Sequence, residues 1–194
     1  MDQQSPEDLV RSILDGKLEG YELLVERFQI PIFRYCYHIL GHREEAEDAT
    51  QEVFLKAYRH LNKYNVEVPF TAWLYKISYR HCIDVIRKRK VSKLIPFLFQ
   101  NEKQNSTVDE YIENVYFSEP VYLSLMKLSL EERTLLILRG VDEKTFEEIS
   151  MIVNKKSSSL RKKYERTAAK FRLYYSQVKG GSEKDAMETY RLEY

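Results

Sequence analysis

Few residues in this 194-residue chain favour turns, because only six are glycine and five are proline. β-Sandwiches and doubly wound α/β proteins need many turns and glycine loops, so this scarcity favours an all-α fold. Cysteine is rarer still, with only Cys36 and Cys82 in the chain. Neither forms a CxxC motif or a cluster with histidine at metal-binding spacing. A disulfide framework and a cysteine-based zinc site are therefore excluded. We expect a cytosolic chain without a metal or other cofactor.

Long apolar runs are also missing. The uninterrupted run near the middle, Leu94–Phe99, is far shorter than the roughly 20 residues of a membrane-spanning helix. The opening residues MDQQSPED are polar and acidic, which is not typical of a secretory signal. No GxxxxGK[ST], HExxH or GxSxG motif occurs. We therefore expect neither membrane insertion nor an enzyme.

Charge is nearly balanced, with a net value of +1, but it is unevenly distributed. Residues 66–93 carry seven basic and two acidic side chains, and residues 146–172 carry eight and three. Between these blocks, residues 94–119 carry one basic and five acidic side chains. Charge blocks of this kind indicate partners rather than a fold. Two basic blocks on one chain favour two contacts with a polyanion.

Apolar residues recur at helical spacing along most of the chain. The predicted helical segments cover 5–16, 18–40, 43–62, 70–90, 121–138, 146–153 and 157–175. Pro31 lies inside the second of these and is expected to break or kink it. Periodicity fails over residues 91–118, which predicts a flexible linker. We expect an N-terminal helical domain over 1–92, a linker over 93–118, a C-terminal helical domain over 119–176 and a polar tail over 177–194.

The C-terminal domain contains a helix-turn-helix pattern over residues 145–172. A short amphipathic helix is followed by a three-residue turn from Asn154, a residue that tolerates the left-handed conformation. On the next helix an apolar stripe faces the core, and a short-polar and basic face suits a DNA groove. Its candidate DNA-binding residues are Lys155, Lys156, Ser157, Ser158, Ser159, Arg161, Lys162 and Arg166. An ordinary basic surface helix is the alternative.

The helix predicted over 43–62 has an acidic outer face. Its predicted inner face comprises Ala46, Ala49, Val53, Phe54, Ala57, Tyr58 and Leu61. The opposite face comprises Glu44, Asp48, Gln51, Glu52 and Leu55. DNA would repel this face, whereas a basic protein surface would be steered to it and anchored by the leucine. A solvated acidic face is the alternative.

The helix predicted over 70–90 is basic and aromatic. Lys76, Arg80 and Arg87 fall on one side at spacings of four and seven residues. Tyr75 and Tyr79 are interleaved with them, and rings beside basic groups suit unstacked single-stranded bases. Trp73 fits the core better than a base platform. This helix is a second candidate nucleic-acid surface.

Three segments carry a family resemblance. Residues 46–54 (AEDATQEVF) resemble the polymerase-binding helix of bacterial sigma factors, and residues 70–77 (FTAWLYKI), with Ile83, Asp84 and Arg87, resemble the segment that recognises the promoter −10 element. Residues 128–138 (LSLEERTLLIL), with 145–149 (TFEEI), resemble the domain that binds the −35 element. In this order and spacing, over residues 18–175, the chain resembles extracytoplasmic-function sigma factors of the sigma-70 family.

The resemblance implies a role for each surface. The acidic face with Glu44, Asp48, Gln51, Glu52 and Leu55 would dock on the clamp of the largest subunit of core RNA polymerase. The flap of the second-largest subunit would be a further contact, the acidic linker would follow the RNA path, and an anti-sigma factor is a further candidate partner. The −10 DNA would contact Asn65, Val66, Phe70, Tyr75, Lys76, Tyr79, Arg80, Arg87 and Lys88, and the −35 DNA would contact the helix-turn-helix residues.

Two other protein classes stay open at this point. A helix-turn-helix transcription regulator with a helical effector or dimerisation domain explains the C-terminal domain but leaves the acidic face unused. An all-α adaptor that binds only proteins leaves both basic blocks unused. The apolar run Leu94–Phe99 allows two interpretations, docking of a regulator or packing on the preceding helix.

Overall fold

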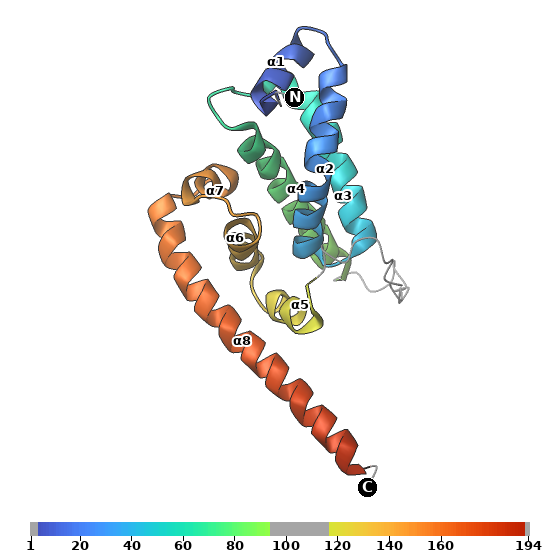
Figure 1. Ribbon diagram of the computed structural model, residues 1–194, viewed down its shortest axis with the longest axis vertical. Coiled ribbons are helices and arrows are strands. Elements are labelled where there is room, and N and C mark those ends of the chain that lie inside the picture. Colours follow the sequence, from blue (N-terminus) through green and yellow to red (C-terminus); the bar gives the residue numbers. More distant parts are fainter. Residues whose placement is uncertain (1–3, 94–116, 193–194) are drawn as a thin grey trace.

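The computed structural model describes residues 4–93 and 117–192 (Figure 1). The described residues form helices and connecting loops without a strand, which confirms the all-α prediction. The helices are α1 (Pro6–Leu14), α2 (Glu19–Leu40), α3 (Arg43–His60), the 3-10 turn η1 (Leu61–Lys63), α4 (Phe70–Lys93), α5 (Glu119–Met126), α6 (Leu130–Gly140), α7 (Phe146–Val153) and α8 (Ser157–Leu192).

Local capping residues determine where several helices begin and end. Ser5 accepts a 3.1 Å hydrogen bond from the backbone N–H of Asp8, and Pro6 occupies the first position of α1. Ser129 and Thr145 form complete capping boxes at the start of α6 and α7. Asn154 ends α7 in the left-handed conformation, with φ of 56°, as the sequence predicts. These ends are specified by short-range sequence.

The N-terminal unit is built around α2, which contacts α1, α3 and α4. Its core contains large side chains with at most 1% of their surface exposed: Leu24, Ile32, Tyr35, Ile39, Phe70 and Leu74. Burial of each such side chain stabilises the fold by roughly 1.5–3 kcal/mol relative to exposure. The outer faces of α3 and α4 are thereby held in fixed positions beside each other.

The C-terminal unit comprises α5, α6, α7 and the long α8, which contacts the other three helices. Its core contains Leu135, Ile137, Leu138, Ile149, Ile152 and Leu160, each almost fully buried. On α8, Leu160 and Thr167 are buried and Tyr164, Ala168 and Phe171 are half-buried, so the predicted apolar stripe faces inward. The helix-turn-helix arrangement of α7 and α8 is as predicted.

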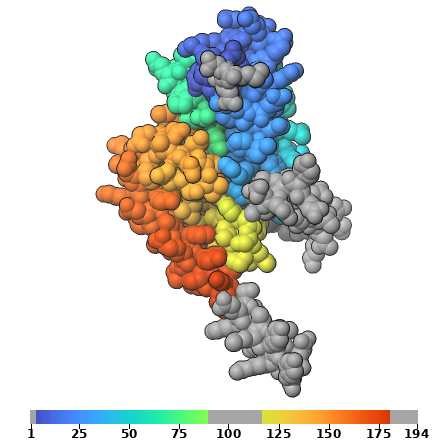
Figure 2. Space-filling view, in the orientation of Figure 1, coloured from blue at the N-terminus to red at the C-terminus, as the bar shows by residue number. Residues whose placement is uncertain are grey.

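The two units pack directly against each other. Helix α7 contacts α4, and α6 contacts α2, so one hydrophobic core runs through both units. Figure 2 shows the C-terminal unit lying beside α2 and α4. Residues 94–116 of the predicted linker, including the apolar run Leu94–Phe99, lie outside the described residues.

Three sequence predictions need correction. Pro31 does not break α2, which was one of the two outcomes predicted for it; the helix continues from Glu19 to Leu40, because packing on three neighbouring helices outweighs the roughly 3 kcal/mol cost of an interior proline. Helix α8 does not stop at Tyr175 before a polar tail but continues to Leu192, since the two glycines at 180 and 181 weaken a helix without forbidding it. Tyr58, predicted to be inward, is 48% exposed.

Candidate nucleic-acid and protein interfaces

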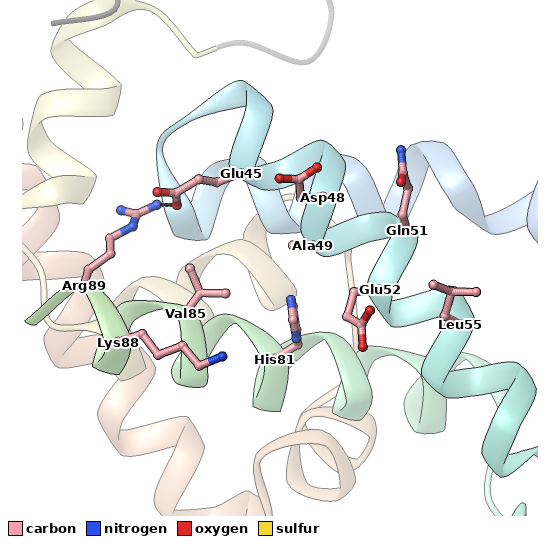
Figure 3. Close-up of a pocket in the computed structure, with 10 residues that line it drawn as sticks. All are labelled: Glu45, Asp48, Ala49, Gln51, Glu52, Leu55, His81, Val85, Lys88 and Arg89. Carbon is pink, nitrogen blue, oxygen red and sulfur yellow. Dashed lines mark ion pairs between the residues drawn. The ribbon is translucent and has the colours of Figure 1, made fainter. Parts of the chain in front are cut away.

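The acidic face of α3 is open to solvent. Glu44, Asp48, Gln51 and Leu55 are exposed and Glu52 is half-buried, as the sequence predicts. All of them except Glu44 border a groove of about 630 Å³ between α3 and α4, shown in Figure 3. Across the groove lie Val85, Lys88 and Arg89 of α4, with Arg89 paired to Glu45. The face therefore combines acidic side chains with an apolar floor at Val85 and Leu55.

A second groove on the other side of Leu55 was not predicted from the sequence. It has a volume of about 540 Å³ and is lined mainly by Tyr21, Val25, Phe54, Leu55 and Tyr58. The Tyr21 and Tyr58 rings meet edge to face with centroids 4.9 Å apart, which keeps Tyr58 at the surface. Leu55, 49% exposed, therefore lies between two grooves. Tyr58 was misassigned because helical periodicity places it on the edge of the inner stripe.

The basic side chains of α4 are distributed along its accessible sides. Arg80, Arg87 and Lys88 are exposed, and Lys76 and Tyr79 are half-buried. Among the described residues, Arg80 makes no ion pair or hydrogen bond, so its guanidinium is free to bind an anion. The ammonium of Lys56 lies 2.9 Å from His81 Nδ1, which links α3 to α4 between the two faces. The acidic and basic surfaces are thus direct neighbours.

Two predicted DNA contacts are buried in this structure. Phe70 is 1% exposed and packs against the rings of Tyr64 and Trp73, so it is a core residue that DNA cannot reach. Tyr75 is 3% exposed and lies beneath the C-terminal unit. Sequence reasoning assigned Tyr75 to DNA because aromatic residues are interleaved with charges along α4, and it assigned Phe70 to DNA from the family resemblance. Asn65 and Val66, in the preceding loop, are exposed as predicted.

The recognition face of α8 is largely free. Ser158, Ser159, Lys162 and Arg166 are exposed, and Ser157 is half-buried. Lys162 and Arg166 form no ion pair or hydrogen bond with any described residue. Unpaired, exposed cations on one helix face suit phosphate oxygens.

The other basic residues around this face are already engaged. Lys155 pairs with Glu131, and Arg161 pairs with Glu147 at 3.3 Å while lying over the Phe146 ring. Lys156 is exposed. Lys155 and Arg161 must leave their carboxylates before they can contact DNA, which makes Lys162 and Arg166 the stronger candidates.

The described residues contain neither a metal-binding cluster nor a membrane-spanning helix. No group of three or more His, Cys, Asp or Glu side chains in the described part of the chain is placed to hold a metal ion. Within the same ranges, no helix combines the length and apolar character needed to cross a bilayer.

Comparison with known proteins finds similar sequences over most of the chain. Residues 24–91 match Sigma-70 region 2, which spans α3 and nearly all of α4. The chain is 26% identical over 155 residues to the ECF RNA polymerase sigma factor SigW of Bacillus subtilis, covering 75% of this chain and 83% of SigW. It is 25% identical over 163 residues to the ECF RNA polymerase sigma-E factor of Escherichia coli K12, covering 79% of this chain and 85% of that factor.

Solved structures support the same fold. CnrH, in its complex with the cytosolic domain of CnrY, matches with a TM-score of 0.69 and 17% identity, over 90% of this chain and 99% of CnrH. RpoE of Bartonella quintana, in complex with the anti-sigma factor NepR, also matches with a TM-score of 0.69 and 16% identity, over 81% of this chain and 98% of RpoE. The solved structures show the fold alone; the region 2 match, together with the sequence relatives SigW and sigma-E, shows that the chain belongs to the extracytoplasmic-function group of the sigma-70 family.

Proposed function

We propose that this chain binds the core of bacterial RNA polymerase and supplies it with promoter recognition and DNA strand opening. The observation that carries the proposal is the juxtaposition of an exposed acidic face on α3 with exposed basic side chains on α4. The acidic face of α3 repels DNA, and the basic side chains of α4 attract it. A protein that bridges a basic protein surface and promoter DNA needs both, whereas a regulator that binds DNA alone needs only the second.

The polymerase contact is assigned to α3. Glu44, Asp48 and Glu52 would steer a basic surface of the largest-subunit clamp, and Gln51 would add hydrogen bonds. Leu55 and the grooves beside it would accept apolar side chains, which supply most of the affinity at protein interfaces. The flap of the second-largest subunit is the proposed partner of the C-terminal unit.

The DNA contacts are assigned to α4 and α8. The exposed face of α8 would enter the major groove of the −35 element. Lys162 and Arg166 would contact phosphates and bases there, and Ser158 and Ser159 would contact base edges. Arg80, Arg87 and Lys88 would hold phosphates near the −10 element, while Tyr79 would stack on separated bases. The work done is binding and strand separation, so we propose no catalysis by the chain itself and place its action in the cytoplasm with the polymerase.

An inhibitory protein partner is also proposed. CnrH and Bartonella RpoE were both solved in complexes, with the cytosolic domain of CnrY and with the anti-sigma factor NepR. A protein of the same class is the proposed regulator of this chain.

Gel filtration with bacterial core RNA polymerase tests the proposal. The full chain should co-elute with core enzyme in a one-to-one complex, and Asp48→Lys with Glu52→Lys should abolish co-elution, since two attractive charges become repulsive. The matched control is Asp15→Lys with Glu165→Lys, which makes the same charge change at exposed positions off α3. Clean separation of the wild-type chain from core enzyme, with DNA binding retained, would support the helix-turn-helix regulator instead.

A further inference from the structure

One carboxylate holds two of the cations around the helix-turn-helix. Glu131 lies in the first turn of α6. The Nζ atom of Lys155 is 2.5 Å from its Oε1 atom, and the Nζ atom of Lys163 is 2.7 Å from its Oε2 atom. Lys155 belongs to the turn between α7 and α8, and Lys163 belongs to α8. Glu131 therefore joins the turn to the recognition helix, with each of its oxygens occupied by a different ammonium.

The surroundings of Glu131 keep its carboxylate ionised. Burial raises its pKa, but hydrogen bonds from Lys155 and Lys163 outweigh burial, so the pKa lies below its ordinary value. The side chains of Glu131 and Lys163 are each 29% exposed. Partly buried pairs are screened less by salt than pairs at an open surface. These two lysines are therefore held at neutral pH.

A second carboxylate holds an arginine of α8. Glu147 lies in the first turn of α7, and its Oε1 atom is 3.3 Å from Nη2 of Arg161. The guanidinium also lies 5.2 Å from the centroid of the Phe146 ring, within the range of a cation–π contact. Arg161 is thus held by two contacts, although its side chain is exposed.

The held and the free cations occupy different parts of the α8 surface. A helix turns by about 100° per residue, so Arg161 and Lys163 lie on opposite flanks of the face that carries Lys162 and Arg166. Lys162 and Arg166 make no ion pair with any described residue. The free cations therefore lie in the middle of the face, and carboxylates hold the cations at both of its edges.

We propose that Glu131 and Glu147 are specificity-determining residues, which compete with DNA phosphates for the cations at the edges of α8. On a duplex without a matched site, the edge cations stay on their carboxylates and the free cations supply the phosphate contacts. On a matched duplex, base contacts offset the cost of breaking the ion pairs, and the edge cations move to phosphates. This inference rests on the proposed function of α8 in DNA binding.

The strength of these ion pairs suits such a competition. Breaking one pair near the surface changes an equilibrium by at most about fivefold. Each pair is therefore weak enough to open when bases are recognised. Non-specific binding depends on phosphate neutralisation, so it is weakened most when three cations are withheld. The carboxylates thereby lower the affinity for unmatched DNA more than the affinity for a matched site.

Salt dependence of binding to a fluorescein-labelled random-sequence duplex tests the competition. Glu131→Gln keeps the shape of the side chain and removes its charge, so it should release Lys155 and Lys163. The slope of log K against log salt should steepen by about two in this variant and by about one in Glu147→Gln, one for each released cation. Affinity at low salt should rise roughly threefold to tenfold.

Two comparisons separate released cations from a change in overall charge. Glu165→Gln removes the same charge from an exposed residue of α8 that makes no ion pair with any described residue, and it should leave the slope unchanged. In a chain that carries Lys155→Ala and Lys163→Ala, Glu131→Gln should no longer steepen the slope, because no held cation is left to release. Circular dichroism and thermal melting confirm that each variant is folded.

A matched duplex measures specificity. The wild-type chain selects this duplex from a random pool, and the affinities of all variants are then measured on it. Glu131→Gln and Glu147→Gln should change these affinities less than they change the affinities for the random duplex. The ratio of matched to random affinity should therefore fall by about threefold or more in each variant.

The outcomes separate this inference from the proposed function. Unchanged slopes in Glu131→Gln and Glu147→Gln, with a matched duplex selected by the wild type, would overturn the competition and leave DNA binding intact. Equal gains on the random and the matched duplex would overturn the role in specificity. A wild-type chain that neither selects a duplex nor co-elutes with core polymerase would reject the proposed function, and the inference with it.

Discussion

The carboxylate of Glu7, in the first turn of α1, accepts a 2.9 Å hydrogen bond from the backbone N–H of Phe70, the first residue of α4. A side chain 63 residues away thus satisfies an amide at the start of α4, which carries the proposed −10 surface. A carboxylate at this end is also favoured by the helix dipole. The position of α4 therefore depends on α1.

Loss of this long-range cap should weaken the N-terminal unit. Glu7→Ala is expected to lower the free energy of unfolding by about 1 kcal/mol, the usual effect of a lost cap, and Glu7→Gln by less because an acceptor remains. Urea denaturation measures both. Glu47→Ala, which removes only the surface pair with Arg43, should change stability by less than about 0.5 kcal/mol. Equal losses for Glu7→Ala and Glu47→Ala would count against the cap.

Gly41 should resist substitution for two reasons, its left-handed backbone conformation and the lack of room for a Cβ atom. It ends α2 with φ of 79°, and a Cβ atom there would lie 2.7 Å from Tyr122 Oη, a group of the C-terminal unit. Gly16, with φ of 93°, has open space where a Cβ would lie, with no atom within 4 Å, and provides the matched control. Alanine at either site costs about 1–2 kcal/mol of backbone strain. Gly41→Ala should cost measurably more in urea denaturation, and an equal cost would show that Tyr122 moves aside freely.

Phosphate contacts on α8 should appear in the salt dependence of DNA binding. Lys162→Ala with Arg166→Ala should weaken duplex binding and reduce the slope of log K against log salt by about two, one for each lost contact. Fluorescence anisotropy with a duplex, measured over a series of salt concentrations, gives the slope. Arg59→Ala, an exposed residue at the end of α3, is the control and should leave the slope unchanged. An unaltered slope in the double variant would place the DNA on another face.

Acid should destabilise the fold through His38. Burial, with a further contribution from Arg34, lowers the pKa of His38 from 6.5 to about 4, and its ring stacks on Phe117 at 4.0 Å. Above pH 6.5 the imidazole is neutral in both folded and unfolded states, so it contributes no pH dependence. Between pH 6.5 and 4 only the unfolded chain binds the proton, so stability falls as the pH falls, by about 2 kcal/mol at pH 5.

Urea denaturation at pH 7.5 and pH 5 checks the His38 prediction. The variant His38→Phe should lose less stability over this range than the wild type. His81, whose pKa is also lowered by burial, contributes in the same direction to both proteins and cancels in the comparison. An identical loss in the two proteins would assign the acid sensitivity to other groups.

Much of the architecture follows from local sequence. The helix-turn-helix of α7 and α8 is specified by Thr145, by the left-handed Asn154 and by an apolar stripe that includes Leu160. The exposed acidic face of α3 follows from helical periodicity, since Asp48 and Leu55 lie opposite Ala49 and Val53. Such features depend on residues within a few turns of one another. For this reason a single sequence predicts them well.

Tertiary packing decided the remaining features. The sequence of α2 contains Pro31, which local rules treat as a break, but burial against three helices keeps the helix whole. Tyr75 was predicted to contact DNA, yet its ring packs on Tyr35 of α2, and Lys144, almost 70 residues later, lies over it. No local pattern marks Arg34 and Asp142 as partners, because an ion pair between a helix and a distant loop depends on how the two units meet. The sequence by itself therefore determined the helices and the character of their faces, and only the tertiary structure decided which faces remain open to polymerase and DNA.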